Sequence, residues 1–244
     1  DIACAALDAG VVCVTDVGSV KGPIVAAVEA ARPSTAARFV GGHPMAGSEQ
    51  LGAAGADADL FVGASWVLTP TPTSDPDAFA RVREMVSALG AAMLAMTPQH
   101  HDELVAVVSH VPHLAATTLV HLAVQSDADR AGILRLAAGG FRDMTRIAAG
   151  HPGIWPDICM GNRTAIADAL DRLTSELSRV RDLVLAGDRD ALLAFLEAAQ
   201  AERRALPPRT AEAGPLVELR MPVPDRPGVL AEVTTLVGHH GTNI

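Results

Sequence analysis

Short β-branched stretches alternate with helical stretches over residues 1–98, and this alternation constrains the fold more than any other feature of the chain. The strand-like segments are VVCVTDVGS, residues 37–40, SWVLTP and AAMLAMT, and the helical ones are VAAVEAARP, which ends before Pro33, and residues 77–89. The order strand, helix, strand, strand, helix, strand is typical of α/β layers with a mainly parallel sheet. We therefore expect an α/β domain over residues 1–98.

The pattern changes after Pro98, where strand signals give way to consecutive helices. Helices are expected at residues 101–124, 133–136, 155–160, 162–186 and 188–206. One face of the 162–186 helix carries apolar residues at three- and four-residue steps: Ile166, Leu170, Leu173, Leu177 and Val180. This face could pack against the protein's own core or against a partner subunit, and periodicity does not distinguish the two. Residues 99–206 are thus predicted to be all-α.

A third pattern begins after a segment rich in proline and glycine. Residues 207–215 contain Pro207, Pro208, Gly214 and Pro215, which mark a linker. Residues 216–244 have the pattern of a strand, a DRPG turn that caps a helix, and the beginning of another strand. We expect the start of a further small β-α-β module there.

Charge and cysteine content exclude some classes of partner. The formal net charge is −9 and the isoelectric point is about 5.4, which argues against nucleic acid or an anionic membrane surface as a partner. The three cysteines show no CxxC pairing, so we expect the protein to be located in the reducing cytoplasm. Residues 104–124 are apolar but interrupted by histidines, which favours a buried helix over a membrane span. No signal-peptide pattern follows Asp1.

His43 lies in the glycine-rich segment GGHPMAGSE, directly after a predicted strand. Open α/β sheets bind ligands at the carboxyl ends of their strands, and flanking glycines let the backbone approach a flat ligand. The loop from Asp16 to Lys21 follows another strand in the same way, so both loops could face one crevice. The alternative is a turn histidine that is hydrogen-bonded to backbone.

Two further clusters could carry chemistry. His110 and His113 lie three residues apart, shortly after His100 and His101, but no third ligand with metal-site spacing follows, so we predict no metal site. Core histidines or hydrogen-bonding pocket histidines are the alternatives. The segment GGFRDMTR (139–146) places two arginines among apolar helices. An arginine there could bind a carboxylate bidentately, form an internal ion pair, or be a surface charge.

The order of these motifs resembles prephenate and arogenate dehydrogenases. DVGSVKG, FVGGHPMAGSE, the TP after SWVL, VVSHVPH, GGFRDMTRIA and IW follow one another as in that family, and the resemblance extends from Val11 to about Leu206. It implies a partial Rossmann-like nucleotide-binding domain, then a helical dimerisation domain, and an ACT-like start in the tail. It also implies oxidative decarboxylation of prephenate to 4-hydroxyphenylpyruvate with NAD or NADP, as part of tyrosine biosynthesis.

The resemblance also implies roles for individual residues. The catalytic histidine is matched by His43, and the serine near the nicotinamide by Ser19. The substrate-binding positions are His110, Arg146, Gly139, Trp155, Glu49 and Asp143, and the cofactor-binding positions are Asp16, Val17, Gly18, Ser19 and Met45. A homodimer through the helical half is expected, and tyrosine is a possible feedback ligand by analogy with ACT domains.

One mark of the family is not found in these 244 residues, namely the GxGxxG loop that supports a pyrophosphate. We expect the front of the nucleotide-binding domain to precede Asp1, and the choice between NAD and NADP stays open. Arogenate is the alternative substrate. A noncatalytic amino-acid-sensing module and a metal-dependent hydrolase are the alternatives from other classes.

Overall fold

The computed structural model describes residues 2–47, 55–124, 132 and 135–206. The α/β part contains α1 (Ile2–Asp8), β1 (Val14–Thr15), α2 (Gly22–Ala31), η1 (Ala36–Arg38), β2 (Phe39–Pro44), β3 (Ser65–Thr69), α3 (Pro76–Ala88) and β4 (Ala92–Ala95). The strands form one sheet in the order β1-β2-β3-β4. The predicted linker and the ACT-like start at residues 216–244 lie outside the described residues.

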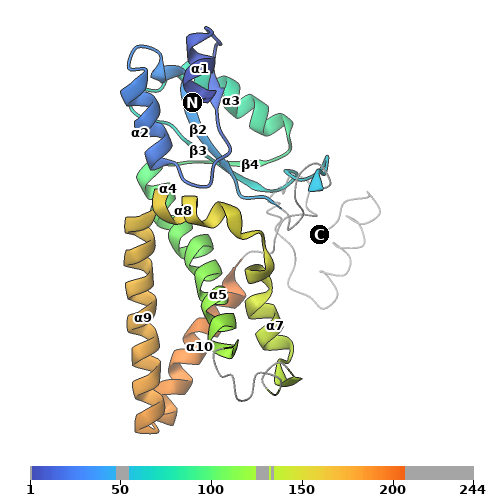
Figure 1. The fold of residues 1–244 in the computed structure, drawn as a ribbon, viewed down its shortest axis with the longest axis vertical. Helices are drawn as coiled ribbons and strands as arrows, with labels where there is room; N and C mark the ends of the chain where they lie inside the picture. The colour runs from blue at the N-terminus through green and yellow to red at the C-terminus, as the bar shows by residue number, and fades with distance from the viewer. Residues whose placement is uncertain (1, 48–54, 125–131, 133–134, 207–244) are drawn as a thin grey trace, which may run out of the picture. The chain divides into compact units, whose positions relative to one another are not determined.

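Helices cover both faces of this sheet. Side chains alternate between the faces of a strand, so Phe39 packs with residues of α1 and α2, while its neighbour Val40 packs with Val82 and Val86 of α3. Figure 1 shows α1 and α2 away from α3 around the strands. Two apolar faces covered by helices are what a strand such as FVGG, without polar alternation, requires.

The sheet is mixed, with two of its three strand pairs parallel. β1 pairs with β2 and β3 pairs with β4 in parallel, whereas β2 and β3 are antiparallel. The expectation of a mainly parallel sheet therefore holds for two pairs and misses the central one. Strand β2 also runs further than residues 37–40, because its pairing with β3 continues through both glycines to Pro44. His43 accordingly lies within a strand, opposite Val67, and not in a loop.

The remaining elements in the described part of the chain are all helices. The elements are α4 (Pro98–Val105), η3 (Ala106–His110), α5 (Val111–Val124), α7 (Gly139–Thr145), η4 (Arg146–Ala149), η5 (Pro152–Ile154), α8 (Trp155–Gly161), α9 (Arg163–Ala186) and α10 (Arg189–Ala205). The prediction of an α/β part followed by an all-α part is confirmed. In Figure 1, α4 and α8 lie next to the sheet, and α5, α9 and α10 extend away from it.

The run from Pro98 to Val124 has the length and apolar composition of a membrane span. Its buried face packs as a core helix does: Ala106 and Val111 form a cluster with Ile166 and Ala169 of α9. The same run buries several polar side chains that are hydrogen-bonded within the protein, which suits a protein interior better than lipid.

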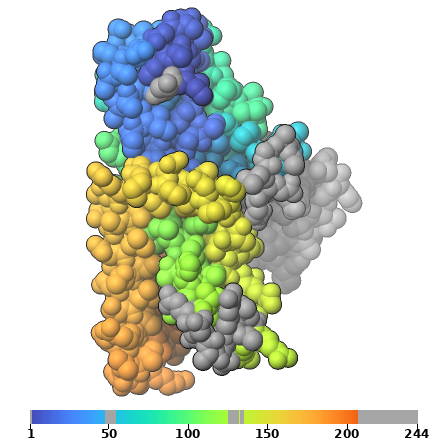
Figure 2. Space-filling view, in the orientation of Figure 1, coloured from blue at the N-terminus to red at the C-terminus, as the bar shows by residue number. Residues whose placement is uncertain are grey.

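The apolar face of α9 is divided between two environments. Ile166 is buried, and Leu170 and Leu173 pack against the core cluster, whereas Leu177 is 60% exposed. The beginning of the helix therefore uses this face for the protein's own core. The distal half leaves apolar side chains open on the surface, where α9 is uncovered in Figure 2.

Candidate functional site

The site is organised around His43, which lies buried near the end of β2. The glycine before it is required by close packing, because a Cβ on Gly42 would lie 2.6 Å from the backbone oxygen of Asp16 and 2.8 Å from Oγ1 of Thr15. Only glycine lets the end of β1 approach β2 so closely. The GGH sequence thus brings the loop after β1 next to His43.

A buried lysine holds these two segments together. The Nζ of Lys21 donates to the carboxylate of Asp16 and, at 2.6 Å, to the backbone oxygen of Gly42. Asp16 also accepts hydrogen bonds from the backbone amides of Gly42 at 3.0 Å and Gly18 at 2.9 Å. Burial lowers the pKa of Lys21, and the attraction of Asp16 and Asp102 offsets only part of this effect. The pair fixes the loop at the end of β1 against β2.

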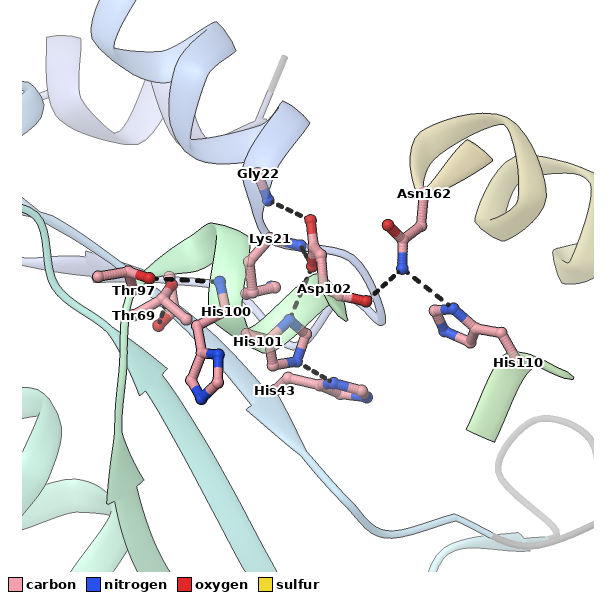
Figure 3. Close-up of polar contacts among 12 residues, drawn as sticks. Lys21, Gly22, His43, Thr69, Thr97, His100, His101, Asp102, His110 and Asn162 are labelled. Atoms are coloured by element: carbon pink, nitrogen blue, oxygen red, sulfur yellow. Dashed lines mark hydrogen bonds and ion pairs between the residues drawn. The ribbon is translucent and has the colours of Figure 1, made fainter. Parts of the chain in front are cut away.

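A second network joins His43 to the helical half (Figure 3). The Nδ1 of His43 lies 2.8 Å from Nε2 of His101, and Nδ1 of His101 lies 2.7 Å from Oδ1 of Asp102. The two oxygens of Asp102 accept the backbone amides of Lys21 and Gly22, each at 2.8 Å, at the N-terminus of α2. A carboxylate is well placed there, because helix N-termini favour negative charge. Asp102 therefore links α4, α2 and the site histidine.

The network continues to His110 through Asn162. The Nδ2 of Asn162 donates to the backbone oxygen of Asp102 at 2.7 Å and lies 3.3 Å from Nδ1 of His110. His110 ends the π-helical turn η3, a rare distortion that is often found at functional sites. Burial lowers the pKa of His110; Asp102 opposes this effect and His101 adds to it. His110 is thus favoured in its neutral form as a hydrogen-bonding group.

An aromatic wall lies beside His110. The ring of His113 stacks on Trp155, with centroids 3.5 Å apart and planes 8° apart, and His110 meets the same indole edge-on at 6.3 Å. Burial lowers the pKa of His113, so the stacked ring is favoured in its neutral form. Trp155 begins α8, and the two histidines lie on the facing helical run. One face of the indole is thus used by His113, and its other face could stack on a ring-shaped ligand.

The other residues predicted to bind cofactor or substrate follow β1 and β2 or lie on α7 and η4, apart from one that lies outside the described residues. The half-buried Ser19 follows β1, and Met45 follows β2 and donates its amide to the backbone oxygen of Ser65 at 2.8 Å. Asp16, Val17 and Gly18 line a cavity of about 960 Å³ together with apolar residues of α1, β1 and α2. Gly139 and Asp143 are exposed on α7, and Arg146 begins η4. Glu49 lies outside the described residues.

The network contains five residues to which the sequence reasoning gave no such role: Lys21, His101, Asp102, His113 and Asn162. The histidines of this run were weighed as metal ligands, as core residues or as hydrogen-bonding groups in a pocket, but no partner was assigned to His101 or His113. Within the described ranges, no group of three or more His, Cys, Asp and Glu side chains is arranged to hold a metal ion. The adjacent pair His101-Asp102 before an apolar helix was the available signal, since a buried carboxylate requires hydrogen-bond donors.

The electrostatic surroundings keep His43 uncharged. Burial is the largest cause, and the neighbouring His101, Lys21 and His110 further disfavour an imidazolium, so that the pKa of His43 falls to about 4 despite the opposing charge of Asp16. At neutral pH the ring is a neutral imidazole. It can accept a proton or a hydrogen bond from a ligand hydroxyl.

This shift is testable by titration. The ring protons of His43, followed by NMR, are expected to show a midpoint near pH 4, while free histidine in the same tube titrates near pH 6.5. The unfolded chain binds this proton below about pH 6.5 and the folded one only near 4. The His43 contribution to unfolding free energy therefore falls as the pH drops between those values. A midpoint near that of free histidine would contradict the described environment.

The chain is similar to known proteins along most of its length. Residues 5–95 match the family model described as "Prephenate dehydrogenase, nucleotide-binding domain", and residues 97–198 match "Prephenate dehydrogenase, dimerization domain". The prephenate dehydrogenase of Bacillus subtilis is 38% identical over 92% of this chain and 60% of its own length. The chain thus spans about three fifths of that relative.

Two solved structures of similar fold are described as a prephenate dehydrogenase and an arogenate dehydrogenase. A prephenate dehydrogenase from A. aeolicus, in complex with hydroxyphenyl propionate and NAD+, is 32% identical with a TM-score of 0.74, over 79% of this chain and 66% of that one. A Synechocystis arogenate dehydrogenase is 31% identical with a TM-score of 0.66, over 79% of this chain and 68% of that one. With both family models matched in order along most of its length, the chain belongs to the prephenate dehydrogenase family.

Proposed function

We propose that this chain carries the reaction pocket of an NAD(P)-dependent prephenate dehydrogenase, which converts prephenate to 4-hydroxyphenylpyruvate in tyrosine biosynthesis. The observation that carries the proposal is the buried, neutral His43, held through Nδ1 by His101 at the carboxyl end of β2. The names of the relatives and the substrate-like ligand of the A. aeolicus structure support the same substrate class.

The proposed chemistry needs a hydrogen-bond acceptor, an anchor for carboxylate and an exclusion of water. His43 accepts the proton of the ring hydroxyl as carbonyl character develops, and gives this proton back to the oxygen when the ring becomes the phenol of the product. The C–H electron pair leaves as hydride, and the electrons of the broken carbon–carboxylate bond complete the aromatic ring as CO2 departs. The reaction then balances without net uptake or release of a proton.

Bound NAD(P)+ would supply the hydride acceptor. We propose that Val17, Gly18 and Ser19, together with Met45, contact this cofactor, because they follow the strands that end at the site. The cavity of about 960 Å³ beside the first two has the size of a small-molecule site. Asp16 belongs to the same proposal through its backbone, since its carboxylate already accepts three hydrogen bonds from the protein.

The substrate itself would contact His110, Gly139, Asp143, Trp155 and Glu49. His110 and Trp155 support this assignment most directly, because their rings lie next to each other and His110 belongs to the network that holds His43. Gly139 starts α7 with open space around its Cα, since an added Cβ would meet no atom within 4 Å. This space is where a ligand group could approach the backbone.

Arg146 is proposed to bind a carboxylate of prephenate. Arg146→Ala is expected to raise KM for prephenate by about tenfold to a hundredfold with a smaller change in kcat, because this contact exists already in the ground state. Steady-state kinetics of the full-length protein give both constants. Arg142→Ala, on the preceding turn, is the matched control and should leave KM nearly unchanged. Equal KM values for Arg146→Ala and the parent protein would reject Arg146 as the anchor.

A homodimer is proposed through the helical half, as the description of the matched family model suggests. The exposed apolar residues on α9 and α10 support it: Leu177, Val184, Leu185, Leu193 and Leu196. Exposed apolar side chains that are grouped on two helices favour association of subunits. Analytical ultracentrifugation is expected to show a dimer that Leu185→Glu converts to monomer, whereas Val62→Glu in the α/β part does not. A monomeric parent protein would contradict the proposal.

The proposal also covers the second candidate substrate, the cellular location and the feedback ligand. Arogenate is the second candidate substrate, which the similarity to the Synechocystis enzyme supports. A paired assay of prephenate and arogenate, each with NAD+ and NADP+, distinguishes all four combinations. A cytoplasmic location fits the three free cysteines and a biosynthetic role. Tyrosine feedback through residues 216–244 rests on the sequence resemblance to ACT domains.

A further inference from the structure

The hydrogen bond between His43 and His101 can be formed with the hydrogen on either ring. A bond between two imidazoles, here 2.8 Å from Nδ1 to Nε2, requires that one nitrogen carries the hydrogen and the other offers a lone pair. The remaining bonds of the chain His43–His101–Asp102 determine which is which (Figure 3).

Asp102 provides the starting point, because its carboxylate is held in its charged form. Burial alone would raise the pKa of Asp102, but hydrogen bonds from His101 and from the backbone amides of Lys21 and Gly22 outweigh burial and lower it. All three partners approach its oxygens at 2.7 to 2.8 Å. A charged carboxylate only accepts hydrogen bonds, so Nδ1 of His101 must carry the proton between them.

The proton positions of the two rings follow in order. When the single ring hydrogen of His101 is on Nδ1, its Nε2 is bare and accepts the hydrogen on Nδ1 of His43. We infer that the Asp102–His101 pair sets the tautomer of His43, keeping Nδ1 protonated and leaving Nε2 as a bare acceptor. His101 and Asp102 are then positioning residues, because they act on a ligand only through His43.

The far side of the His43 ring is suited to this role. Its Nε2 makes no hydrogen bond to any residue within the described ranges, and Figure 3 draws it pointing away from His101. A hydroxyl that donates to Nε2 would meet a lone pair and not an N–H.

The surrounding contacts make the arrangement rigid. Asp102 is held from α2 by two backbone amides, and its own backbone oxygen accepts Nδ2 of Asn162 at the start of α9. His101 is 1% exposed, so its ring has little room to rotate. The tautomer of His43 is thus determined by contacts from three helices. The catalytic consequence rests on the proposed function, whereas the tautomer itself does not.

The experiment is ¹⁵N NMR of the histidine rings in the full-length protein at neutral pH, without cofactor or substrate. The His43 signals are assigned with His43→Asn. The expected result is a protonated Nδ1 and an unprotonated Nε2 for His43. A protonated Nε2 in the parent protein, whether from the other tautomer or from donation by a doubly protonated His101, would overturn the inference.

His101→Phe tests the cause, with His100→Phe on the adjacent, exposed position as its control. The first variant is expected to shift His43 toward the Nε2-protonated tautomer and to lower kcat by about tenfold to a thousandfold with KM for prephenate little changed. The control should change neither. An unchanged His43 tautomer in folded His101→Phe would overturn the inference, and if that variant does not fold, the parent spectrum still decides.

Two outcomes would separate the tautomer of His43 from the proposed function. A Nδ1-protonated His43 in a protein that does not oxidise prephenate or arogenate would support the tautomer inference and reject the proposed function. An active dehydrogenase with a Nε2-protonated His43 would do the reverse.

Discussion

Replacing His43 with Asn is expected to lower kcat for prephenate by about a hundredfold to ten-thousandfold and to leave KM nearly unchanged. Asparagine can keep a hydrogen bond to His101, so the local structure should persist. It has no basic ring nitrogen to accept the hydroxyl proton. The loss therefore falls on the transition state, in which that oxygen acquires carbonyl character.

Steady-state kinetics of the full-length protein test this prediction. His121→Asn, on an exposed face of α5, is a matched control that removes an imidazole without touching the network. Its kcat should equal that of the parent protein. A His43→Asn variant with parental turnover would remove His43 from the mechanism.

Asp102→Ala is expected to lower the free energy of unfolding by about 3 kcal/mol or more. The substitution leaves the backbone amides of Lys21 and Gly22 without their acceptor in a buried region, and it removes the partner of His101. Unmade hydrogen bonds of buried groups are costly, and here they lie where the α/β part meets the helical part.

Urea-induced unfolding at one fixed protein concentration measures this effect, since the stability of a dimer depends on concentration. Asp168→Ala, on the exposed side of α9, is the control and should change the midpoint little. Similar midpoints for the two variants would show that the Asp102 contacts add nothing to stability.

The periodicity of the sequence predicted most of the elements and their order. The helix expected at residues 162–186 is observed as Arg163–Ala186, and the one expected at 77–89 as Pro76–Ala88. Local patterns predict such elements because burial of one face repeats along the chain. The antiparallel pairing of β2 with β3 was not predicted, because strand direction depends on partners distant in the sequence.

The end of β2 also could not be predicted from local sequence patterns. The segment GGHP looked like a loop because glycine and proline are rare within strands. In the structure these residues pair with Thr69 to Trp66, and the packing of β1 against Gly42 explains the glycine there. Tertiary contact, not local propensity, makes this segment a strand.

The candidate site was only partly accessible from sequence. His43, His110 and Trp155 were singled out by motif, and they lie in or beside the observed network. The contacts that hold them join residues far apart in the chain, such as Asn162 with Asp102. No local sequence pattern indicates that two such residues are in contact. The supporting residues could therefore be identified only in the folded structure.

The π-helical turn that ends at His110 is a further example. Its sequence AVVSH has no feature that separates it from an ordinary helical turn, yet the structure forms a π-helical turn over these five residues. For Asp16, the cofactor contact stays a prediction, and the structure adds a role for its carboxylate that the sequence did not predict. Its carboxylate is used to hold Lys21, Gly18 and Gly42, which is a positioning role.

The most direct test of the proposed function is a product assay of the full-length protein with prephenate and NAD+ or NADP+. We expect reduced nicotinamide, CO2 and 4-hydroxyphenylpyruvate to appear in equal amounts, and His43→Asn to lower the rate of formation of all three together. If neither cofactor is reduced with prephenate or with arogenate, while the protein is folded and dimeric, the proposed function is contradicted.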